Sequence, residues 1–169
     1  MAFVPETGAG LSNSNSYASV AQADSYYADR GNAEWAALTT TEKQQALIKG
    51  TDFLEATYRS SWKGYRVTST QALSWPRAEV VADTFPIPAN IVPLPVVYAC
   101  AELALRSTTA ELLADQGQTV KREKVDVLEV EYQDYSDPTE RYPAVNRILL
   151  PFLLSSSGGG FAQVRVTRT

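Results

Sequence analysis

The chain of 169 residues has 15 basic and 19 acidic side chains, a net charge of −4, one cysteine and no histidine. Without histidine, Ser-His-Asp and Cys-His activation and the usual zinc sites are excluded, and one cysteine cannot form an intrachain disulfide. The acidic balance disfavours tight non-specific binding to nucleic acid, because phosphate contacts need an excess of Lys and Arg. The sequence contains neither a bilayer-spanning apolar run nor a secretory signal, so we expect a cytoplasmic protein without a membrane partner.

The first half of the chain predicts an arm and three helical segments. Residues 1–16 are rich in Gly, Ser and Asn and lack periodicity, which predicts an extended arm. Ser19 has the position of an N-cap for a helix that Gly31 ends, and AEWAAL predicts one or two further turns. The clearest helix spans TTTEKQQALIKGTDFLEATY, in which Thr39 and Glu42 have the spacing of a capping box.

The middle of the chain predicts a structured loop followed by a central helix. Residues 60–94 have no helical period, and five prolines lie between residues 76 and 95, so we expect at most short strands there. Pro95 can begin a helix that runs to about Leu113. This helix is apolar almost all round, which predicts that it is central or covered on its second side by another subunit. Cys100 lies in its middle without a cationic neighbour, and we expect an inert, buried thiol.

The last part of the chain changes character twice. A Val-rich, charged run near 119–133 alternates locally and predicts a β-hairpin that reverses near Asp126. Pro143 begins a last helix, which Pro151 kinks or shortens. A Gly/Ser linker follows, and then an alternating, mildly basic segment, FAQVRVTRT.

Together these patterns predict a mainly α fold, a small bundle of about four helices with a short β-hairpin, a proline-rich loop and an extended C-terminal tail. Residues 1–16 form the arm, residues 17–154 the helical domain, and residues 155–169 the linker and a docking tail.

Two patterns that could indicate a site do not support one. An acidic run is typical of a solvated strand face and lacks the ligand spacing of a calcium loop: Glu129, Glu131, Asp134, Asp137 and Glu140. The glycines at 158–160 lack the flanking elements and the ending of a phosphate loop. We therefore expect no metal, no cofactor and no catalytic residues, and a carboxylate-based hydrolase has no positive support.

The aromatic residues around the proline-rich loop allow two interpretations. Trp62, Tyr65, Trp75 and Arg77 could stack single-stranded bases above a basic groove. The preferred interpretation is that the Trp rings pin the loop to the helices, because aromatic rings bury large areas. In that case Trp75 points into the core and Arg77 emerges at a protein interface, since the residue before a proline is extended.

Several short stretches occur in an order that resembles a known family. They are NSYASVAQADSYYADRGNAEW, TTTEKQQALIKGTDFLEATY, WKGYR with TQALSWPR, an AELAL helix, VKREKV with LEVEY, and YPAVNRILLPFL. The most specific element precedes the helix from Pro95 and consists of Gln71, Leu73, Trp75, Pro76 and Arg77. The order resembles, over about residues 10–154, a bacteriophage structural-protein family similar to head–tail adaptor (connector) proteins. Its members are often named DnaT-like single-stranded-DNA-binding proteins.

The resemblance implies a non-enzymatic virion component. Such adaptors form a ring, typically of twelve copies, beneath the portal of the filled head, where they bind the portal and the next neck or tail protein and extend the channel for double-stranded DNA. The expected location is the virion, after assembly in the host cytoplasm. The alternative name implies a single-stranded-DNA-binding module in phage replication.

The residues expected to bind the portal or a neighbouring subunit are Trp75, Pro76, Arg77, Phe161, Val164, Arg165, Val166 and Arg168. The alternative function would use Trp62, Tyr65, Trp75 and Arg77, and would predict loss of DNA binding without unfolding in Trp75→Ala.

Overall fold

The computed structural model describes residues 2–113, 123–125, 128–130 and 142–154. In this part of the chain lie five α-helices: α1 (Val20–Ala28), α2 (Ala33–Ala37), α3 (Thr40–Tyr58), α4 (Leu94–Arg106) and α5 (Pro143–Leu149). A 3₁₀ turn, η1 (Leu150–Phe152), follows α5 directly, as expected for a helix shortened at Pro151. The mainly α fold is thus confirmed. No helix in these ranges is both long and apolar enough to cross a membrane.

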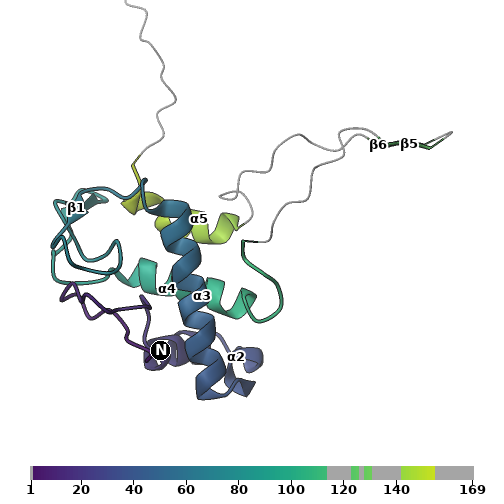
Figure 1. The fold of residues 1–169 in the computed structure, drawn as a ribbon, viewed down its shortest axis with the longest axis horizontal. Coiled ribbons are helices and arrows are strands. Elements are labelled where there is room, and N and C mark those ends of the chain that lie inside the picture. The colour runs from purple at the N-terminus through teal and green to yellow at the C-terminus, as the bar shows by residue number, and fades with distance from the viewer. Residues whose placement is uncertain (1, 114–122, 126–127, 131–141, 155–169) are drawn as a thin grey trace, which may run out of the picture.

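Helix α4 is the centre of the bundle. It packs against α3, α5 and α1, and α3 crosses in front of it in Figure 1. Its buried side chains include Val96, Val97, Cys100 and Leu103. The sequence allowed a second subunit to cover one side of this helix. In the structure, helices of the same chain cover its apolar surface.

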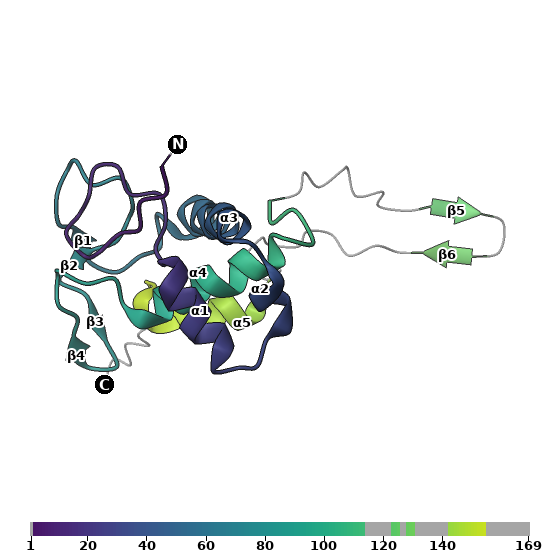
Figure 2. The ribbon, with the colours of Figure 1, turned by 90° about the horizontal axis from the view of Figure 1, so that it is seen from below.

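The strands are short and pair as antiparallel ribbons. β1 (Tyr65–Arg66) pairs with β2 (Arg77–Ala78), and β3 (Val81–Ala82) pairs with β4 (Phe85–Pro86). These four strands lie together beside one end of the helices, at the left of Figure 2. The predicted hairpin is present as β5 (Glu123–Val125) paired with β6 (Leu128–Val130). Its reversal near Asp126 lies outside the described residues.

The predicted helix starts are confirmed in atomic detail. Ser19 and Gln22 form a capping box at α1, and Thr39 and Glu42 form one at α3. Each box satisfies backbone N–H groups that have no partner within the helix. Gly31, at φ +61°, follows α1 where the sequence predicted its end.

Helix α4 is shorter than predicted: it ends at Arg106, not near Leu113. The three residues that follow are Ser107, Thr108 and Thr109, and each side-chain hydroxyl donates to a carbonyl of the last turn at 2.7–3.2 Å. These bonds compete with the next helical N–H groups for the same acceptors, which favours a turn.

The first residues form a folded loop instead of the extended arm that was expected. Residues 2–16 turn back on themselves, because Asn15 N–H donates to the Val4 carbonyl and Glu6 N–H donates to the Ser16 carbonyl. The buried Glu6 carboxylate organises the turn by accepting hydrogen bonds from Gly8 N–H, Gly10 N–H, Leu11 N–H and the Ser14 hydroxyl at 2.9–3.0 Å.

Helices α3 and α4 approach each other closely at Gly50. A Cβ atom added there would be 2.7 Å from the Cys100 carbonyl oxygen and 3.1 Å from the Ala104 nitrogen. Beside it, the Thr51 hydroxyl lies 3.3 Å from the Cys100 sulfur. Cys100 is buried and its pKa is raised by that burial, so the expectation of an inert thiol is consistent with the structure.

We predict that Gly50→Ala destabilises the protein, although alanine is the better helix former. The added methyl group meets backbone atoms of α4, so the helices must separate, at a cost of about 1–3 kcal/mol in the free energy of unfolding. The measurement is urea unfolding followed by circular dichroism. The exposed Gln45→Ala on the same helix should change stability by less than about 0.5 kcal/mol. A stabilised Gly50→Ala protein would contradict the close packing of α3 and α4.

Candidate nucleic-acid interface

The stretch QALSWPR is held from inside by Gln71. This side chain is buried, and its amide donates to the carbonyls of Leu73 (2.9 Å) and Pro76 (3.0 Å). Its amide oxygen accepts from Thr68 N–H at 2.9 Å. One amide therefore supplies hydrogen bonds to backbone groups along the whole stretch.

Arg77 lies in the interior, so the prediction that it emerges at the surface is wrong. It is only 8% exposed, and its guanidinium donates to the carbonyls of Lys63, Gly64 and Ser74 at 2.7, 2.6 and 3.3 Å. A planar group with five donors can satisfy several carbonyls of an irregular loop at once. Arg77 thus ties β2 to the segment that precedes β1.

Trp62 and Trp75 form the apolar floor of the same loop. They are 2% and 0% exposed. The two rings meet edge to face at 5.7 Å, and Phe152 of η1 covers Trp75 at 6.0 Å. The Trp75–Pro76 peptide bond is cis, and Pro76 is also buried. The interpretation that the Trp rings pin the loop to the helices matches this packing, and neither ring presents a face on which a base could stack.

The loop is also joined to helix α3 through Glu55. The Glu55 carboxylate accepts hydrogen bonds from the Ser74 N–H (2.9 Å), the Ser74 hydroxyl (2.8 Å) and the Tyr17 hydroxyl. Burial, and next the charge of Glu55, raise the pKa of Tyr17 well above its usual value. The phenol therefore stays protonated and remains a donor to the carboxylate.

Two aromatic side chains of the loop region are exposed, in contrast to the tryptophans. Tyr65 of β1 is 54% exposed and Phe85 of β4 is 71% exposed. The Tyr65 hydroxyl donates to Glu79 at 3.2 Å, which leaves the ring itself at the surface. We call Tyr65 and Phe85 the aromatic platform. Sequence reasoning identified Tyr65 but missed Phe85, which comes directly after a turn in which Asp83 and Thr84 have positive φ.

Positive charge gathers in the same part of the chain. Residues 59–91 contain four basic side chains (Arg59, Lys63, Arg66 and Arg77) and two acidic ones (Glu79 and Asp83), a net charge of +2 in a protein of net charge −4. Arg59 is exposed, and Lys63 and Arg66 are partly exposed. The Lys63 ammonium donates to the carbonyls of Val81 (3.2 Å) and Pro151 (2.7 Å), so one of its three donors remains for a ligand.

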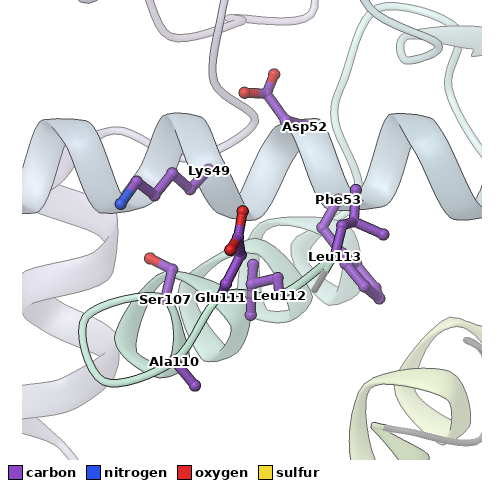
Figure 3. A pocket seen from close by; sticks show the side chains of 8 residues that line it. All are labelled: Lys49, Asp52, Phe53, Ser107, Ala110, Glu111, Leu112 and Leu113. Atoms are coloured by element: carbon purple, nitrogen blue, oxygen red, sulfur yellow. The ribbon is translucent and has the colours of Figure 1, made fainter. Parts of the chain in front are cut away.

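A pocket of about 360 Å³ lies elsewhere, between α3 and the turns after α4 (Figure 3). Phe53 and Leu112 form its apolar part, and Lys49, Asp52 and Glu111 line its polar part. Burial, and next the charge of Glu55, raise the pKa of Asp52. Among the described residues, no group of three or more His, Cys, Asp or Glu side chains could hold a metal ion.

The predicted docking residues of the tail, Phe161, Val164, Arg165, Val166 and Arg168, lie outside the described residues. Of the predicted stacking residues Trp62, Tyr65, Trp75 and Arg77, the structure leaves only Tyr65 open to a ligand.

The chain matches a protein-family model. A family model described as "Putative DnaT-like ssDNA binding protein" matches residues 1–169, beyond the range of about 10–154 over which the sequence resembled a family. No curated protein and no solved structure matches the chain.

This match overturns the expectation of a head–tail connector. That expectation named a portal-binding phage neck protein, a structural virion ring of twelve copies around a DNA channel. The matching family is instead described by single-stranded DNA binding, and the match shows no phage origin. The tail, which the resemblance had left out, is part of the matched region. The chain belongs to the family of DnaT-like single-stranded-DNA-binding proteins.

Proposed function

We propose that this protein is a non-enzymatic module that binds single-stranded DNA through the aromatic platform and the cations around it. The observation that carries this proposal is that Tyr65 and Phe85 are exposed within the segment of the chain that has a net positive charge. Proteins that bind single strands combine stacking rings with a positive surface, because every base has a face to stack and every nucleotide carries a phosphate. The name of the matching family supports the same ligand.

The division of roles follows from burial. Tyr65 and Phe85 are free to stack on bases, while Arg59, Lys63 and Arg66 lie within reach of solvent for the phosphates. Trp62, Trp75 and Arg77 act from beneath, where they fix the loop that carries the platform. A rigid support of this kind lowers the conformational entropy lost on binding.

We predict that Tyr65→Ala and Phe85→Ala each weaken binding about 5–150-fold, since stacking of one base on an aromatic ring is worth about 1–3 kcal/mol. Fluorescence anisotropy with a labelled oligo(dT) at low salt measures the affinity. The matched control is Leu113→Ala, which removes a 47% exposed apolar side chain outside the loop. Undiminished binding by both platform variants would contradict the site, and no binding by the unaltered protein at low salt would contradict the function.

Trp75→Ala, unlike the platform variants, should lower the stability of the protein. The indole is completely buried, so its removal leaves a cavity and lowers the free energy of unfolding by about 3–5 kcal/mol. Loss of DNA binding should then follow the unfolded fraction in a urea titration. A stable Trp75→Ala protein that has lost only DNA binding would restore the stacking role first considered for this residue.

The salt dependence of binding tests the cations separately. If Arg59, Lys63 and Arg66 each contact one phosphate, the logarithm of the binding constant should fall with the logarithm of salt concentration with a slope of about −2. Arg59→Ala should reduce that slope by about 0.7, because one phosphate contact is lost. Gln45→Ala, on the exposed surface of α3, should leave it unchanged. A slope near zero would exclude a phosphate-binding role for this surface.

A further inference from the structure

We propose that the pocket between α3 and the turns after α4 binds the segment 161–169 of the same chain. The pocket is distinct from the aromatic platform, and the inference does not depend on DNA binding. Its basis is the apolar and acidic lining of the pocket, the course of the chain at Leu154, and the composition of the residues that follow.

The lining of the pocket combines an apolar floor with carboxylates. Phe53 and Leu112 are buried at its base, whereas Leu113 is 47% exposed at its rim. Figure 3 shows the Glu111 carboxylate pointing toward α3, between Lys49 and Asp52 in that view. Two carboxylates and one ammonium give this lining a net charge of −1, so it suits a ligand with an apolar group and more than one positive charge.

The segment 161–169, FAQVRVTRT, has this chemistry. It contains Phe161 for the apolar floor, and it contains Arg165 and Arg168 and no acidic residue. A guanidinium binds a carboxylate through two parallel hydrogen bonds. Among the described ion pairs, neither Asp52 nor Glu111 is paired with Lys49.

The described part of the chain ends at Leu154, which lies near the C-terminal end of α3. Lys63 N–H donates to the Phe152 carbonyl, and Leu154 N–H donates to the Ser61 carbonyl, at 2.9 and 2.7 Å. The chain therefore runs antiparallel to residues 61–63 and passes Leu154 toward the end of α3. Asp52 lies six residues before Tyr58, the last residue of that helix, which is about 9 Å along the axis, and Leu154 lies beside Ser61, three residues beyond Tyr58.

The intervening residues, SSSGGG, are long enough for this distance. A six-residue Gly/Ser chain has a root-mean-square span of about 12–15 Å. A linker whose span is similar to the separation of two sites gives a high effective concentration, so even a weak contact is populated. The same segment on a second copy would lack this advantage.

Disulfide trapping in the full-length chain tests the proposal without DNA. Ala110 is exposed and lines the pocket, so Ala110→Cys is paired with Ala162→Cys beside Phe161. The native Cys100 is 0% exposed and does not compete. The control pairs Ala162→Cys with Ala89→Cys, an exposed alanine outside the pocket. Under mild oxidation the pocket pair should form an intrachain disulfide about tenfold faster than the control pair.

Charge reversal provides the second readout. Asp52→Lys with Glu111→Lys should slow the pocket disulfide to the control rate, and adding Arg165→Glu with Arg168→Glu should restore it. Circular dichroism verifies that each variant is folded. Equal rates for the pocket and control pairs, or no effect of charge reversal, would overturn the proposal. Disulfides formed only between chains, detected by mixing isotope-labelled and unlabelled protein, would also overturn it. Because no DNA is present, none of these outcomes bears on the aromatic platform.

Discussion

The near-contact of backbones at Gly50 of α3 and Cys100 of α4 is the constraint on which the other parts of the structure depend. With no side chain between the two helices, α3 and α4 pack as one unit, and Thr51 can reach the Cys100 sulfur. The Thr51 hydroxyl also accepts a hydrogen bond from Tyr17 N–H, which places Tyr17 under the loop that contains Ser74. A wider separation of these helices would thus displace the support of the platform as well.

The helices were predictable because their signals are local. A capping box needs only residues three apart, so Ser19 and Thr39 mark helix starts whatever the remaining chain does. The end of α4 was misplaced because three successive hydroxyl side chains favour a turn over apolar periodicity. The loop of residues 2–16 was missed because its order comes from one buried carboxylate, Glu6, and glycine-rich sequence does not reveal such an acceptor.

The candidate site was less predictable, since exposure is decided by contacts distant in the sequence. Trp75 and Tyr65 look alike in sequence as aromatic residues near cations, yet Phe152 covers Trp75, whereas Tyr65 is 54% exposed. Arg77 was expected outside because an extended residue before proline would let Trp75 point inward and Arg77 emerge, but the irregular loop has three carbonyls that need a donor. The net charge of the whole chain also concealed the positive segment of residues 59–91.

The pairing of residues 61–63 with 152–154 has a consequence for the order in which the molecule forms. It joins positions about ninety residues apart, and contacts of such separation close late because a long loop loses much entropy on closure. During translation the ribosome must therefore release the chain past Leu154 before Phe152 can cover Trp75. Until then the nascent protein exposes Trp62 and Trp75, and this interval is when it is most prone to aggregate and most in need of a chaperone.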